Sequence, residues 1–154
     1  MKPTAIVFAL TLLFTSAVVC LADNPNMGTW KLNETKSKLG PGTAKNHTVV
    51  YAAAGDNVKI TVDGVDAEGK STHSEWTGKF DGKYYPVTGD QTSDSRMYKQ
   101  INARTLSLTA KKSGKVTLSG RIVVSADGKT RTVTTNTTNS SGKTVSSKAV
   151  YDKQ

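Results

Sequence analysis

The sequence predicts an all-β domain, arranged as a single up-and-down antiparallel barrel of eight to ten strands. Runs of β-branched and aromatic residues with period-two alternation recur through residues 45–152. Glycine-bearing turns interrupt these runs about every eight to fifteen residues, and hardly any segment shows helical spacing. A meander of about ten strands leaves two long open edges unless its ends meet, so a closed barrel is favoured over a sandwich.

Residues 1–22 have the layout of a secretory signal peptide, with Lys2 near the front, an apolar run and a small residue, Ala22, before Asp23. Residues 23–154 then form one domain, and the expected location is secreted or periplasmic. Two alternatives are a membrane anchor, for which the run is short, and acylation of Cys20. Cleavage after Ala22 would leave the domain without cysteine, so its core and hydrogen bonds alone would hold it together.

The first strand is predicted to begin near Gly28, in the motif Gly-Thr-Trp-Lys-Leu-Asn of residues 28–33. Gly28 gives the backbone room at the barrel floor, and Trp30 and Leu32 point to the same side. Residues 34–44 contain Gly-Pro-Gly and form a loop with room for one helical turn. The other nine strands are predicted at 45–54, 57–65, 71–80, 83–88, 96–101, 104–111, 115–125, 130–138 and 144–152.

Alternation within these strands predicts which side chains face the interior. The predicted inward set is Val58, Ile60, Val62, Leu106, Leu108, Leu118 and Ile122. Residues 130–141 are rich in threonine and serine, which bury little apolar surface, so exposed strand faces are favoured there over a hydrated interior.

The charge of +9, to which Lys2 contributes one unit, raises the question of a polyanionic partner. Many lysines, however, directly follow a glycine in a predicted hairpin turn, where they would be solvated. We therefore expect no nucleic-acid partner, and at most weak contact with anionic envelope surfaces.

Residues 64–71 match the phosphate-binding loop pattern GxxxxGK[ST], but the segment after them alternates like a strand where a helix would be needed. His47 and His73 lie on different predicted strands without metal-ligand spacing. No nucleophile–histidine–carboxylate arrangement stands out. The sequence predicts no catalytic residue, no metal site and no cofactor, so the protein is not expected to be an enzyme.

The opening motif resembles that of small secreted bacterial proteins with a lipocalin-like domain, in the calycin superfamily. Residues 81–89 (DGKYYPVTG) and the closing Ala-Val-Tyr-Asp-Lys of 149–153 resemble the same group. Both chain ends are also similar to fatty-acid-binding proteins, which are ten-stranded barrels. The resemblance to lipocalins implies a structural role for Trp30 at the closed end of the barrel, capped by Arg121 or Arg131. The position of the carboxylate-binding arginine of fatty-acid-binding proteins is occupied by Ala149, and the candidate substitutes are Arg96, Arg104, Arg121 and Arg131.

The leading functional hypothesis is an exported, monomeric barrel that binds a small hydrophobic or amphipathic molecule inside without chemistry on it. The predicted ligand-binding residues are Trp76, Phe80, Met97, Ile101, Val58 and Ile60, and the predicted structural motif is Gly28, Trp30 and Arg121. The alternative is a basic, envelope-associated structural or interaction module whose core is filled and holds no ligand.

Overall fold

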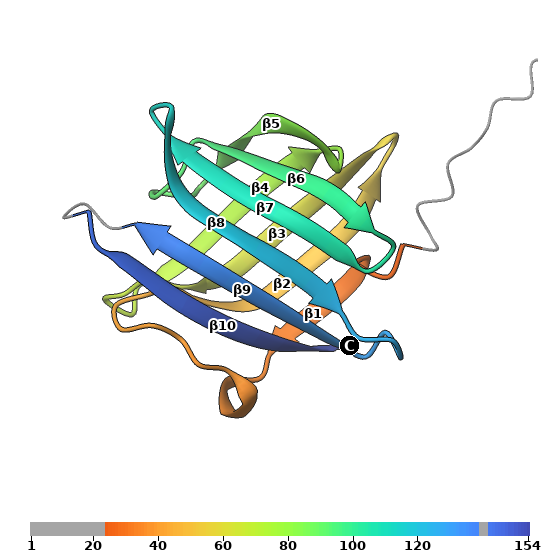
Figure 1. The fold of residues 1–154 in the computed structure, drawn as a ribbon, viewed down its shortest axis with the longest axis horizontal. Coiled ribbons are helices and arrows are strands. Elements are labelled where there is room, and N and C mark those ends of the chain that lie inside the picture. The colour runs from red at the N-terminus through yellow and green to blue at the C-terminus, as the bar shows by residue number, and fades with distance from the viewer. Residues whose placement is uncertain (1–23, 139–141) are drawn as a thin grey trace, which may run out of the picture.

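The computed structural model describes residues 24–138 and 142–154, and it confirms the predicted class. The chain forms one closed antiparallel barrel of ten strands (Figure 1). A single 3-10 turn, η2 (Glu34–Lys36), follows the first strand. The strands are β1 (Gly28–Leu32), β2 (Lys45–Ala54), β3 (Asn57–Val65), β4 (Ser71–Gly78), β5 (Asp81–Thr88), β6 (Ser95–Asn102), β7 (Thr105–Lys112), β8 (Lys115–Val124), β9 (Thr130–Thr138) and β10 (Thr144–Lys153).

Each strand pairs with the next, and the short β1 closes the barrel by pairing with both β10 and β2. Trp30 lies opposite Lys153 on one side and Val49 on the other. Closure leaves no long free edge, which is the reason a barrel was preferred to a sandwich.

The hairpin turns explain why the strand boundaries could be read from the sequence. Positive φ is found at the glycines of six hairpin turns, for example +83° at Gly69 and +70° at Gly128, and also at Gly55, Gly82, Gly114 and Gly142. Such a backbone favours glycine, so glycine marks the places where the chain reverses. The structure also confirms one helical turn within residues 34–44.

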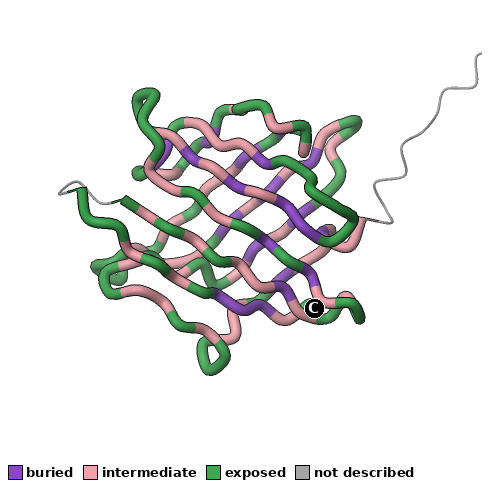
Figure 2. The backbone as a smooth tube through the Cα atoms, in the orientation of Figure 1, coloured by how far each residue is buried: buried purple, intermediate pink, exposed green. Residues whose placement is uncertain are grey.

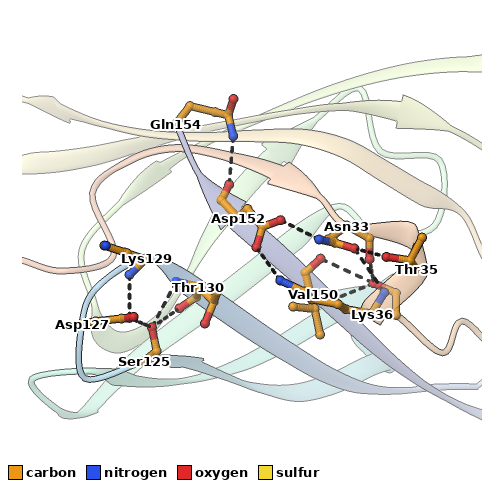
Figure 3. A network of polar contacts seen from close by, with 11 residues as sticks. Asn33, Thr35, Lys36, Ser125, Asp127, Lys129, Thr130, Val150, Asp152 and Gln154 are labelled. Atoms are coloured by element: carbon orange, nitrogen blue, oxygen red, sulfur yellow. Dashed lines mark hydrogen bonds and ion pairs between the residues drawn. The ribbon is translucent and has the colours of Figure 1, made fainter.

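The loop after β1 is held against β10 (Figure 3). The Asn33 amide donates to Asp152 Oδ2 at 2.6 Å, and Lys36 Nζ lies 3.5 Å from Asp152 Oδ1. Further along, Lys38 forms an isolated bridge with Lys148. The loop therefore continues the wall of the barrel beyond the end of β1.

The pairing is thinnest between β4 and β5, where only Glu75 with Thr88 and Trp76 with Val87 are in register. A shallow hollow of about 250 Å³ lies along this seam on the outside, between Thr77 and Pro86. Pro86 has no backbone N–H, which suits a place where the ladder is interrupted.

Buried residues gather along the middle of the strands and toward the end that holds the C terminus (Figure 2). Of the seven side chains predicted to face inward, six are buried and Leu118 is partly buried against the same core. Within residues 24–138 and 142–154, no helix is long and apolar enough to cross a membrane.

Candidate functional site

The interior of the barrel holds the candidate site, and its floor is built around Trp30. This side chain is completely buried, and its indole N–H donates to the Asn26 carbonyl at 2.9 Å. Gly28 begins the strand with φ +106°, and a Cβ at this position would lie 3.1 Å from Lys153 Cε. The predicted roles of Gly28 and Trp30 in the barrel floor are consistent with this geometry. We call the region around Trp30 the closed end.

The arginine above Trp30 is Arg131, and the prediction that placed Arg121 in this motif is wrong. The Arg131 guanidinium carbon lies 5.0 Å from the Trp30 ring centre, 4.8 Å from that of Tyr51 and 4.9 Å from that of Tyr151. Arg121 is exposed on the outer wall, because its neighbour Ile122 points inward and strand side chains alternate. The three rings attract the Arg131 charge through their negative faces.

Arg131 is 2 % exposed and has no carboxylate beside it among the described residues. The Arg131 Nε and Nη1 atoms have no hydrogen-bond partner among the described residues, and the same is true of Asn26 Oδ1. Burial raises the pKa values of Tyr51 and Tyr151, and the Arg131 charge only partly opposes this effect. Both phenols are therefore neutral at physiological pH, and the guanidinium is held mainly by aromatic faces.

An aromatic cluster fills the middle of the barrel, centred on Trp76, which is 1 % exposed. The Trp76 ring stacks on Phe80 with centres 6.4 Å apart and meets Tyr98 edge-on at 4.8 Å. Its N–H donates to the Arg96 carbonyl at 2.9 Å. A Cβ on Gly78 would come within 2.7 Å of the Trp76 ring, so glycine makes room for the cluster.

Four of the six predicted ligand-binding residues line this interior. Val58, Ile60 and Trp76 are buried there, and Phe80 is partly buried against the same core. Val58 and Ile60 on β3 form an apolar wall with Trp76 on β4, where Ile60 lies directly opposite Trp76. Phe80 extends this wall from the connection between β4 and β5.

Met97 and Ile101 do not belong to this wall, and placing them inside was an error. In β6 the inward residue is Tyr98, which is 3 % exposed and lies opposite Leu108. Met97 is therefore on the outer face, and Ile101 is 49 % exposed at a register shift between Gln100 and Asn102. The sequence favoured the wrong face of β6 because Arg96, two residues before Tyr98, made the inward face look polar.

On the side of the aromatic cluster that is away from Trp30, the inward positions of the strands carry small side chains. Register places Ser147 opposite Thr135, Thr135 opposite Gly120, and Gly120 opposite the buried Leu108. On the facing wall, Ser74 lies opposite the inward Val62. All the small residues in this set keep partial exposure although they point inward. We call this region the open end; here the threonine-rich strands line the interior on one face, which the favoured exposed-strand interpretation missed.

An ionic cluster closes one side of the open end. Arg96 Nη2 lies 2.7 Å from Asp90 Oδ2, and both side chains are 15 % exposed. Thr92 and the buried Ser93 also donate to the Asp90 carboxylate. Burial of Asp90 opposes its ionisation, but these hydrogen bonds and the Arg96 charge outweigh burial and lower its pKa.

A hollow of about 520 Å³ lies at the rim of the open end, between the loop at 39–43, the start of β2 and the turn between β3 and β4. Its lining includes Lys45, His47 and Asp66. The segment that resembles a phosphate-binding loop forms this turn, where Asp66 Oδ1 accepts from the backbone N–H of Lys70 at 2.8 Å. No helix follows, and β4 begins at Ser71.

The described residues contain no group of three or more histidine, cysteine, aspartate or glutamate side chains placed to hold a metal ion. His73 lies on the outer wall, 2.6 Å from Asp63, which raises its pKa through the hydrogen bond they share.

No known protein family matches this chain, and no curated protein matches it. The class is therefore defined by the fold alone. A closed, ten-stranded, up-and-down antiparallel barrel is consistent with a calycin-like fold.

Proposed function

We propose that this protein is an exported, non-enzymatic barrel of the lipocalin type, which binds one small amphipathic molecule in the open half of its interior. The observation that carries the proposal is the partial exposure of inward-facing small side chains next to a buried aromatic wall. Barrels of this size can enclose a single small ligand.

The geometry suggests how such a ligand would lie. Its apolar part would approach the wall formed by Trp76, Phe80 and Tyr98, which already exclude water from the middle of the barrel. Its polar part would remain among the hydroxyl groups of Thr135 and Ser74 at the open end. The closed end has no part in binding, because its aromatic rings pack directly on Arg131.

The first experiment is native mass spectrometry of the protein purified from its own host, to detect a co-purified small molecule. A fatty acid such as oleate is then titrated while tryptophan emission is followed. Trp30→Phe removes the second tryptophan and leaves Trp76 as the only reporter. A saturable change in Trp76 emission is expected. Absence of both a co-purified molecule and saturable oleate binding would show that the interior is a packed core.

Two neighbouring threonines on β9 provide a matched pair of variants. Thr135→Phe places a large ring inside the open end, whereas Thr134→Phe places the same ring on the exposed outer face. Thr135→Phe should raise the Kd for oleate at least tenfold. Thr134→Phe should leave this Kd within about twofold of the value for the parent. Circular dichroism checks that both variants fold, and equal binding by the two would contradict an interior site.

A further inference from the structure

Charge is divided unequally between the two halves of the barrel wall. Strands β1 to β5 carry four basic and three acidic residues, whereas β6 to β10 carry nine basic residues and a single acidic one, Asp152. The nine are Arg96, Lys99, Lys111, Lys112, Lys115, Arg121, Arg131, Lys148 and Lys153. Two of them, Arg96 and Arg131, point inward, which leaves seven on the outer wall and strand ends. This asymmetry belongs to the strands themselves and not to the hairpin tips.

The register arranges part of this charge in a line across the strands. On the outer face, Lys99 lies opposite Ser107, and Ser107 lies opposite Arg121. The line continues from Arg121 through Thr134 to Lys148, and from Lys148 to Lys38 in the loop after β1. We call Lys99, Arg121, Lys148 and Lys38 the basic row. Cations and hydroxyl side chains alternate along it from β6 to β10.

All four side chains of the basic row are exposed, and none forms an ion pair with any described residue. The acidic residue of this half, Asp152, is held by Asn33 and Lys36 beside the floor of the barrel. Between Lys99 and Lys148 the outer positions of β7, β8 and β9 contain no carboxylate. The row is therefore an uncompensated line of positive charge.

The curvature of the barrel limits what can contact the whole row. Lys99 and Lys148 are four strand-to-strand steps apart in a closed ring of ten strands, so they face directions well apart around the barrel axis. A flat lipid surface can touch only a few neighbouring strands of such a convex wall. A flexible chain can follow the curve over the full distance, which is about 19 Å at ~4.8 Å per step.

We propose that the basic row binds an acidic polysaccharide, a flexible chain of sugar units that carries repeated carboxylates. The carboxylates would pair with Lys99, Arg121 and Lys148, and the sugar hydroxyls would bond to Ser107 and Thr134 between them. This site is on the outside of the barrel and does not depend on a ligand in the interior. Several weak contacts along one chain provide affinity that a single surface ion pair lacks.

The test measures binding of the full-length protein to polygalacturonate by calorimetry at several salt concentrations. Changing Lys99, Arg121 and Lys148 together to Gln should weaken binding at least tenfold. If polysaccharide binding follows the polyelectrolyte behaviour of nucleic acids, the slope of log Kd against log salt should fall by about one for each cation removed. Polygalacturonate fragments too short to span the distance from Lys99 to Lys148 should bind markedly more weakly than longer ones.

The matched control changes Lys70, Lys83 and Lys129 to Gln, which removes the same charge from hairpin tips and their flanks. This variant should bind polygalacturonate with a Kd within about threefold of that of the parent. An equal loss in both triple variants would mean that net charge alone drives binding and would overturn the proposal. Binding of the parent to phosphatidylglycerol vesicles or single-stranded DNA that equals or exceeds its polygalacturonate binding would also overturn it.

Discussion

The two ends of the barrel interior are built on the same strands but are filled in different ways. At the closed end Trp30, Tyr51, Tyr151 and Arg131 are each no more than 3 % exposed. At the open end the inward positions carry serine, threonine and glycine and keep partial exposure. A ten-stranded wall is wide, so only large side chains fill its interior. Side-chain size along each strand therefore determines which end is closed.

The largest expected effect is at the centre of the closed end. Trp30→Ala should lower the free energy of unfolding by about 3–5 kcal/mol, because a large buried ring is lost and a cavity remains. Denaturant unfolding followed by circular dichroism measures this change. A variant as stable as the parent would mean that the closed end does not hold the barrel together.

The open end contains the ion pair of Asp90 and Arg96, so the stability of the protein should depend on pH. Asp90→Asn should cost about 1–3 kcal/mol at neutral pH, because Arg96, Ser93 and Thr92 lose an ionised acceptor. The pKa of Asp90 in the folded protein is lowered, so the carboxylate stabilises the fold above its ordinary pKa of about 3.9. That contribution disappears as the pH falls through the lowered pKa.

The difference in the free energy of unfolding between the parent and Asp90→Asn should therefore narrow steadily below about pH 4. Thermal unfolding between pH 2 and 7 provides the measurement. A difference that stays constant over this range would indicate that Asp90 acts through its shape and not through its charge.

Removal of the positive charge from the closed end should lower the free energy of unfolding by a smaller amount. Arg131→Met keeps much of the volume but loses the attraction to three aromatic rings, and we expect a cost of about 1–2 kcal/mol. Arg121→Met is the control on the exposed wall and should change stability by less than about 0.5 kcal/mol. Equal effects at the two positions would contradict the assignment of Arg131 as the cap of Trp30.

The smallest change in stability is expected for a substitution at the open end, where the interior is least filled. Thr135→Val replaces a hydroxyl by a methyl group of similar size at the open end and should change stability by less than about 0.5 kcal/mol. Equilibrium unfolding in urea measures it. A loss above about 1 kcal/mol would show that the open end is packed as tightly as the closed end.

Most strand boundaries were predictable because each depends on a few neighbouring residues. The strands predicted at 45–54, 57–65 and 130–138 agree with β2, β3 and β9 at both ends, and the others differ by one or two residues. Glycine at the tips and alternating residues between them are local signals. They do not require knowledge of the rest of the chain.

The inward face of a strand was harder to predict where polar and apolar residues share it. In β6 the pair Met97 and Ile101 looked like the buried side, whereas the structure buries Tyr98 and pairs the inward Arg96 with Asp90. Between Ala110 and Lys111 a register shift places Val116 of β8 opposite Lys111. Val116 is therefore 52 % exposed, although it alternates with Leu118 in the sequence. A bulge changes the alternation and leaves no clear mark in composition.

Local patterns were enough to predict the all-β class, the order of the hairpins and a structural role for Trp30, because hydrophobic period, turn glycines and one large aromatic side chain are local properties. By contrast, the position of Arg131 and not Arg121 over Trp30, and the alignment of Lys99, Arg121 and Lys148 in one row, are visible only in the folded barrel. These relations join residues on different strands through the register of pairing. Register depends on closure of the whole barrel, so no single segment of the sequence contains it.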